Sequence, residues 1–197
     1  MLEYKNTVIL FGRSMFINQI REYIPDLIKH YHTIGCNQFV NSYPDVENVI
    51  FYDDIPKINV TEKNKVIADV RLINNKKSIA YEWLNAHKNK ELYLCINNKF
   101  IFENGDSKLC FFFHTPTMAL NWSYRKGYKN VVLAGIDLTS DTRHFDCDYQ
   151  ACWTEKRLLQ ARNHLEKVCT RYLNVYQLNP DSDLKIPKIS IKDLLNV

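Results

Sequence analysis

Glycine is scarce in this sequence, with 5 residues among 197, and two familiar phosphate-binding signatures are missing. Neither the Walker loop GxxxxGK followed by Ser or Thr nor the dinucleotide motif GxGxxG occurs. Those motifs need glycine because the backbone must approach phosphate groups closely. Their absence argues against P-loop kinases and dinucleotide-dependent dehydrogenases.

Long apolar segments and a secretory leader are also missing. No stretch approaches the ~20 apolar residues of a membrane helix, and MLEYKNTVILF lacks the basic start and small-residue cleavage site of a signal peptide. The cysteines are dispersed, and Cys36, Cys95 and Cys110 lie in apolar, strand-like runs, which is typical of reduced, buried thiols. We therefore expect a cytoplasmic protein without a transmembrane segment.

No Pro/Gly/Ser-rich linker and no internal repeat divides the chain. Its 197 residues suit one domain, and 46% hydrophobic with 13% aromatic residues suffice for a core. The net charge of +4 suits an anionic ligand, but the Lys and Arg residues are scattered, so no nucleic-acid partner is indicated. We predict a single nucleotide-sugar-binding domain over 1–197.

Short apolar runs alternate with helix-forming runs along the chain. The patterns predict strands at 7–12, 32–37, 48–53, 65–70, 91–96, 109–113, 130–137 and 173–178. Helices are predicted at 16–28, 78–88, 115–126 and 154–172. The repeated strand–helix–strand order indicates an α/β class, a Rossmann-like domain with a mainly parallel central sheet flanked by helices.

The segment 114–146 carries the strongest functional signal. It contains a helix-forming run, an apolar strand that ends in Gly-Ile-Asp at Asp137, and the polar loop LTSDTRHFD. Open α/β sheets bind ligands at the carboxyl ends of their strands, so a nucleotide-type ligand is the first hypothesis. The alternative is that the segment forms only one buried helix–strand unit.

Four sequence blocks occur in the order seen in a known family. They are VILFGRS at 8–14, CNQF at 36–39, VIFYD at 49–53 and GYKNVVLAGID at 127–137, the last followed by FD, LEK and NPDS. With these blocks the chain resembles the bacterial lipooligosaccharide sialyltransferases of glycosyltransferase family 42. It resembles more loosely the motility-accessory-factor and pterin-diphosphokinase-like proteins. The resemblance implies a GT-A-like sialyltransferase variant of the Rossmann-like fold, which transfers a sugar from a CMP-sugar to an acceptor hydroxyl without a metal.

The resemblance also implies roles for particular residues. Gly12 and Ser14 would line the nucleotide loop, while Asn37 and Gln38 would contact the base, ribose or sugar. Asp53 would occupy a position that contacts the donor. The alternative for Asn37 and Gln38 is an ordinary turn at a strand end.

Thr115 stands where the family has a small hydroxyl residue at a helix start, near the donor carboxylate. A helix N-terminus favours an anion through its backbone N–H groups and dipole. The alternative is that Thr115 is simply an N-cap.

The chain departs from the family at four functional positions. Arg13 replaces an Asn of the nucleotide loop, and the family's paired tyrosines fall near Thr139 and Arg143. Because a guanidinium holds phosphate bidentately, we expect Arg13 or Arg143 to contact phosphate, and the donor need not be a sialic acid. The family's general-base histidine aligns with Trp153, which cannot accept a proton.

His144 is our candidate for the missing base. It lies beside Asp146, and a neighbouring carboxylate orients an imidazole and raises its basicity. Asp146 itself is the alternative base, and His114 is a second histidine candidate, more typical of a residue satisfied by backbone groups. The remaining interpretation is that the segment around His144 is a solvated acidic loop without a catalytic role.

No metal site is expected. His144, Cys147 and Cys152 would supply only part of a zinc site, which needs four ligands. If the donor is a nucleoside diphosphate, Mg²⁺ would instead be held by aspartates of one region, namely Asp137, Asp141, Asp146 and Asp148.

We predict a glycosyltransferase whose partners are a nucleotide-sugar donor and a glycan or other hydroxyl acceptor. Two alternatives stay open. One is a non-catalytic nucleotide or nucleotide-sugar binding protein, suggested by Trp153, and the other is a pyrophosphate-transferring enzyme like the looser relatives. The chain is short beside the transferases it resembles, so we expect the acceptor to be bound with the help of a partner subunit or another copy in a homo-oligomer.

Overall fold

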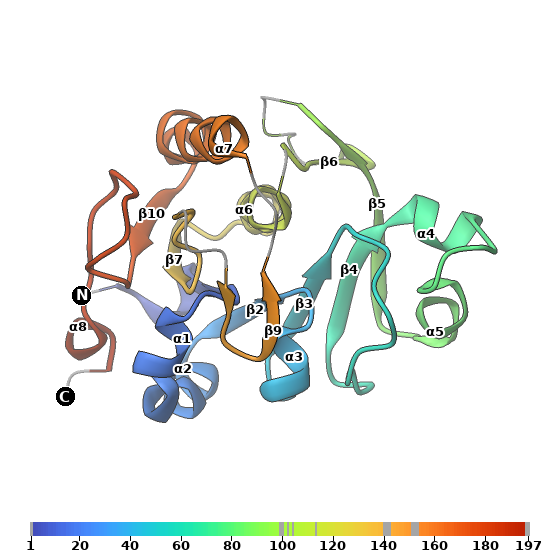
Figure 1. Cartoon of the computed structure of the whole chain (residues 1–197), viewed down its shortest axis with the longest axis horizontal. Coiled ribbons are helices and arrows are strands. Elements are labelled where there is room, and N and C mark those ends of the chain that lie inside the picture. The colour runs from blue at the N-terminus through green and yellow to red at the C-terminus, as the bar shows by residue number, and fades with distance from the viewer. Residues whose placement is uncertain are drawn as a thin grey trace.

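An eight-stranded parallel sheet runs through the centre of the computed structural model (Figure 1). The structure describes residues 2–98, 101, 103, 105–112, 114–139, 143–150 and 154–195, with only the backbone for 147–150. The strand order is β10-β7-β1-β2-β3-β4-β5-β6, and every registered pair is parallel. The strands are β1 (Thr7–Phe11), β2 (His32–Cys36), β3 (Asn48–Phe51), β4 (Lys65–Asp69), β5 (Lys90–Ile96), β6 (Lys108–Cys110), β7 (Asn130–Ala134) and β10 (Asn174–Gln177). The predicted α/β class is confirmed.

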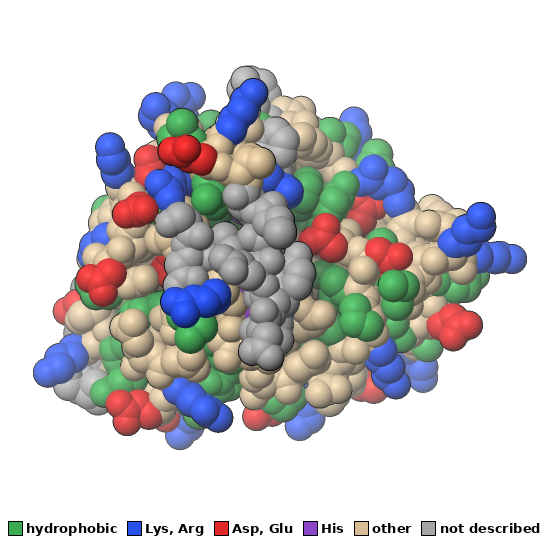
Figure 2. All heavy atoms as spheres, in the orientation of Figure 1, with side chains coloured by type: hydrophobic (Ala, Val, Ile, Leu, Met, Phe, Trp, Pro, Cys, Tyr) green, Lys and Arg blue, Asp and Glu red, His purple; other side chains and the backbone are tan. Residues whose placement is uncertain are grey.

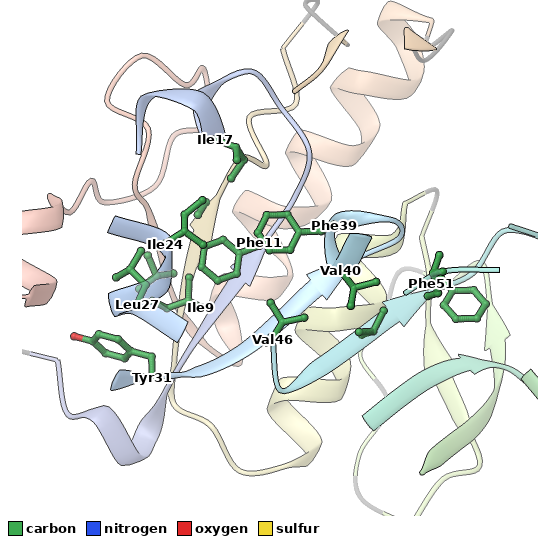
Figure 3. Packing of buried hydrophobic residues seen from close by; sticks show 14 of the residues in the cluster. Ile9, Phe11, Ile17, Ile24, Leu27, Tyr31, Phe39, Val40, Val46 and Phe51 are labelled. Atoms are coloured by element: carbon green, nitrogen blue, oxygen red, sulfur yellow. The ribbon is translucent and has the colours of Figure 1, made fainter. Parts of the chain in front are cut away.

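The central strands are apolar along their whole length because both faces of the sheet are covered. All five residues of β1 are buried, and alternate residues enter different cores. Ile9 and Phe11 join one hydrophobic cluster, whereas Val8 and Leu10 join the cluster on the other face. Figure 3 shows the first cluster, in which the ring of Phe11 stacks on that of Phe39 with centroids 4.8 Å apart.

The helices are divided between the two faces of the sheet (Figure 1). Residues of α6 (Thr115–Arg125) and α7 (Glu155–Lys167) pack in the cluster that contains Leu10. The other cluster receives residues from α1 (Phe16–Gln19), α2 (Ile24–His30), α3 (Phe39–Ser42) and α8 (Ile191–Leu195). The remaining helices are α4 (Val70–Asn74) and α5 (Tyr81–Ala86), and the 3₁₀ turns cover Tyr4–Asn6, Arg21–Tyr23 and Cys169–Arg171. None of the helices in the described part of the chain has the length and apolar character needed to cross a membrane.

Several predicted elements have different bounds in the structure. The helix predicted at 16–28 is divided into α1, a 3₁₀ turn and α2, because Pro25 lacks an N–H and suits the first turn of a new helix, which begins at Ile24. The strand predicted at 65–70 ends at Asp69, whose carboxylate accepts a hydrogen bond from the Arg71 N–H at 2.8 Å and caps α4. The helix predicted at 154–172 ends at Lys167.

A small hairpin occupies the segment that was predicted as a polar loop. Its strands are β8 (Arg143–His144) and β9 (Cys147–Gln150), and they pair antiparallel. An isolated antiparallel bridge joins Ser14 to His144, so the hairpin lies beside the loop that follows β1. This contact brings residues far apart in sequence to one edge of the sheet.

Candidate functional site

A pocket opens at the carboxyl ends of β1, β2 and β7. It is lined by residues 12–14, 36–37 and 135–139, by the starts of α6 and β8, and by Leu158 of α7. From β1 the chain proceeds to β2 on one side, whereas β7 lies on the other side of β1 and leads to β10. The pocket therefore lies at the point where the strand order reverses, which is where open α/β sheets bind ligands.

The cavity has a volume of about 150 Å³. Pockets that enclose a whole drug-sized ligand usually have ~300–1,000 Å³. A nucleotide sugar bound here would therefore have only part of its volume inside the cavity.

The two loops that form the pocket floor touch through their backbones. The Gly12 N–H donates a hydrogen bond to the Ala134 carbonyl at 2.7 Å, and the Ser14 N–H donates to the Gly135 carbonyl at 3.0 Å. A Cβ on Gly12 would collide with the Gly135 carbonyl, and it would lie 2.5 Å from Ile136 Cγ1. Gly12 lines the pocket, as the sequence predicted, and it also allows this backbone contact.

We expect Gly12→Ala to lower the free energy of unfolding by about 3 kcal/mol, because backbone atoms cannot move aside as a flexible side chain would. Urea denaturation measures this change. Gly127→Ala is the matched control, since a Cβ there meets no atom within 4 Å and only the positive φ of 85° is unfavourable. That control should lose about 1 kcal/mol. Equal losses in the two variants would contradict the proposed clash.

Arg13 forms a buried ion pair with Asp146. The Arg13 Nε donates to both carboxylate oxygens at 3.0 Å, and Nη2 donates to Oδ1 at 2.6 Å. The remaining arm, Nη1, donates to Gln38 Oε1. The Arg13 and Asp146 side chains are only 10% and 9% exposed. Asp146 and Gln38 are thus engaged by Arg13 and are not among the residues that line the cavity.

The ion pair is one of several contacts that hold the hairpin against the β1 loop. The Phe145 N–H donates a hydrogen bond to the Arg13 carbonyl at 3.0 Å. The Phe145 ring lies 5.9 Å from that of Phe39 and 6.1 Å from that of Tyr43, measured between centroids. These contacts place His144 in the pocket wall.

The surroundings of His144 favour its neutral form. Burial lowers the pKa of His144, the positive charge of Arg13 lowers it further, and the carboxylate of Asp146 opposes both effects. A neutral imidazole can accept a proton, which is the property that a general base needs.

Two buried side-chain oxygens of the pocket have no hydrogen-bond donor among the described residues. One is Oδ1 of Asn37, a residue with a φ of +54° whose N–H donates to the Ile50 carbonyl at 2.9 Å. The other is Oδ1 of Asp137, a residue that is 6% exposed and whose Oδ2 accepts a hydrogen bond from the Ser14 hydroxyl. Burial raises the pKa of Asp137, although Ser14, Asn179 and Lys188 partly oppose this shift.

The residue that caps the start of α6 is not Thr115, which the sequence offered as the N-cap. Thr115 is buried in the first turn, but the N-cap is His114, whose Nδ1 accepts the Thr117 N–H at 3.3 Å. The alternative role of Thr115 as N-cap is therefore wrong. Burial lowers the pKa of His114 to about 3, so this histidine stays neutral and fixes the start of the helix.

Arg143 is exposed at the pocket rim, whereas Asp53 lies outside the cavity lining. Burial raises the pKa of Asp53, and the charge of Arg157, in the first turn of α7, opposes the shift. Sequence reasoning missed Arg157 as a neighbour of this edge. The sequence contained a signal for Arg157. The positive charge of an arginine in the first turn of a helix interacts unfavourably with the helix dipole, so an arginine at this position indicates a role other than stabilising the helix.

The metal hypotheses concern residues that the structure describes only in part. Asp141, Cys152 and Trp153 lie outside the described residues, as do the side chains of Cys147 and Asp148. Within the described part of the chain, no three His, Cys, Asp or Glu side chains gather in a way that could hold a metal ion. The thiols of Cys36, Cys95, Cys110 and Cys169 are free and buried.

Charged side chains do not gather into one basic region on the face shown in Figure 2. Lys and Arg side chains are scattered there among acidic and apolar ones. An anionic ligand would therefore be recognised by individual groups at the pocket.

Comparison with solved structures shows where this fold occurs. A MAf glycosyltransferase from Magnetospirillum magneticum superposes with a TM-score of 0.65 at 14% sequence identity, covering 94% of this chain and 33% of that one. The chain shares its fold with part of a glycosyltransferase. It spans about one third of that protein's length. This likeness agrees with the Rossmann-like fold that the sequence resemblance implied.

An alpha-2,3-sialyltransferase from Campylobacter jejuni matches with a TM-score of 0.44 at 15% identity, covering 93% of this chain and 79% of that one. Neither a protein-family model nor a curated protein sequence matches this chain.

Proposed function

We propose that this protein is a glycosyltransferase that moves a sugar from a CMP-sugar type of donor to an acceptor hydroxyl. The observation that carries the proposal is the position of His144, a neutral imidazole in the wall of a pocket at the strand-order reversal of a parallel sheet. The shared fold with a glycosyltransferase supports it.

In the proposed reaction His144 takes the proton of the acceptor hydroxyl while the hydroxyl oxygen bonds to the anomeric carbon. The bond from that carbon to the phosphate oxygen breaks, and the nucleoside monophosphate leaves with the electron pair. Arg143 and the N-terminus of α6 lie at the pocket and would offset the charge of the leaving phosphate. Arg143 is favoured for this task because it lines the pocket and is exposed at its rim.

The test measures nucleotide release by the purified protein from a panel of activated sugars, with water or simple sugars as acceptor. We expect CMP release from one CMP-sugar at a rate unaffected by chelation of divalent metal. Release of a nucleoside diphosphate that requires Mg²⁺ would contradict the CMP donor and favour a diphosphate-linked substrate. Nucleotide binding without any turnover would favour the non-catalytic binding protein.

A further inference from the structure

The backbone carbonyls of the pocket wall after β7 accept hydrogen bonds from side chains of the C-terminal part of the chain. Gln177 Nε2, at the end of β10, donates to the Ile136 carbonyl at 2.9 Å. The Ser182 hydroxyl donates to the Asp137 carbonyl at 3.2 Å, and Gln177 Nε2 also donates to this hydroxyl at 3.0 Å. The course of the wall up to Asp137 is therefore fixed by residues that do not line the cavity.

The next residue of the wall, Leu138, has an unfavourable backbone conformation. Its φ is +51°, in the left-handed region that a residue with a branched apolar side chain rarely adopts. Its carbonyl accepts a hydrogen bond from Nε of Arg162 in α7 at 2.5 Å. A hydrogen bond from a charged donor stabilises by more than one left-handed residue costs, so this contact is strong enough to hold the conformation.

Arg162 acts on the pocket from outside it. Its side chain is only 25% exposed and is not among the residues that line the cavity. Its Nη2 lies 3.3 Å from Oδ2 of Asp183, a side chain that is 59% exposed, so this ion pair contributes little. The bond to the Leu138 carbonyl is the contact through which Arg162 reaches the pocket wall.

We propose that Arg162 is a positioning residue, which keeps Leu138 in the left-handed region and so fixes the shape of the pocket wall. Leu138 lines the cavity, so a wall that relaxes to an ordinary backbone conformation changes the space offered to a ligand. Without Arg162 only part of the population would have the binding-competent wall, and the apparent affinity falls with that fraction. This consequence for a nucleotide rests on the proposed function, whereas the hold on the backbone does not.

Glycine at position 138 detects the imposed conformation without any ligand. Leu138→Gly and Leu138→Ala both remove the side chain, but only alanine retains the cost of a left-handed residue. With Arg162 present, we expect the folding equilibrium constant from urea denaturation to be roughly five-fold larger for Leu138→Gly than for Leu138→Ala. In the Arg162→Ala background this advantage of glycine should disappear, because the backbone can then adopt an ordinary conformation.

Arg171→Ala provides the matched background, since Arg171 is an exposed arginine in the 3₁₀ turn Cys169–Arg171. The advantage of glycine should persist there. An equal advantage in the Arg162→Ala and Arg171→Ala backgrounds would overturn the proposal, because Arg162 would then stabilise the fold without imposing the conformation of Leu138. No advantage of glycine in the otherwise unmodified chain would overturn it as well.

Isothermal titration calorimetry with CMP measures the consequence for the pocket. Arg162→Ala should weaken CMP binding roughly five-fold in the chain with Leu138, and by less in the Leu138→Gly background, because glycine adopts the left-handed region without this cost. An arginine that only stabilised the fold would leave the affinity of the folded protein unchanged in both backgrounds. Losses of equal size in both backgrounds would contradict an action through Leu138.

The two measurements separate this inference from the proposed function. If Arg162→Ala abolishes the advantage of glycine but no variant binds CMP, the positioning role of Arg162 stands and the CMP donor is overturned. If Arg162→Ala turns over a CMP-sugar with unchanged affinity and the advantage of glycine persists, the glycosyltransferase stands and the positioning role is overturned.

Discussion

His144→Asn should lower the turnover number by about 10²–10⁴-fold and leave the dissociation constant of the donor nearly unchanged. The reason is that proton removal from the acceptor is expressed in the transition state and not in donor binding. Steady-state kinetics for the turnover number and calorimetry for donor affinity measure the two effects separately. His32→Asn is the matched control, because His32 begins β2 at the opposite edge of the sheet and forms an exposed pair with Glu47.

The pH dependence of turnover provides a second readout of His144. Because burial and Arg13 lower its pKa, the imidazole stays neutral at and somewhat below the ordinary histidine value of about 6.5. We expect the rate to hold down to that value and to fall only at lower pH, as the base becomes protonated. An active variant with an unchanged profile would remove His144 from the chemistry. A loss confined to an Asp146→Asn variant that keeps the wild-type free energy of unfolding would identify the carboxylate as the base, because release of the hairpin would lower both turnover and stability.

Asp146→Ala should lower the free energy of unfolding by about 3–5 kcal/mol, since it leaves the buried guanidinium of Arg13 without its counter-charge. This is a large part of the total of roughly 5–15 kcal/mol expected for a folded domain. Urea denaturation gives the value. Asp183→Ala removes one member of an exposed ion pair and should change stability by less than about 1 kcal/mol.

A double variant separates the charge effect from simple loss of contact. Arg13→Leu combined with Asp146→Leu removes both charges, and we expect it to be more stable than Asp146→Ala alone. Because the pair holds the hairpin that carries His144, the single variant should also reduce turnover. A stable Asp146→Ala variant would show that the ion pair does not hold the hairpin.

The apolar runs of the sequence determined the sheet and its class. Strands such as β1 and β7 are buried along nearly their whole length, so their sequences TVILF and NVVLA are apolar without alternation. The apolar runs therefore predicted the strand ends to within a few residues. They also predicted that Gly12, Asn37 and Asp137, which follow strand ends, lie at one edge of the sheet. The break in the helix predicted at 16–28 was visible as Pro25, but the apolar spacing alone predicted a continuous helix.

Only the tertiary structure decided which polar groups of that edge pair with one another. Arg13 and Asp146 are 133 positions apart, and local pattern contains no information on contacts at that separation. Their ion pair engages the guanidinium of Arg13, which lines the cavity, while Asp146 lies outside the cavity lining. The unpartnered oxygens of Asn37 and Asp137 likewise emerge only in three dimensions, because the absence of a donor depends on every neighbour that packing brings close.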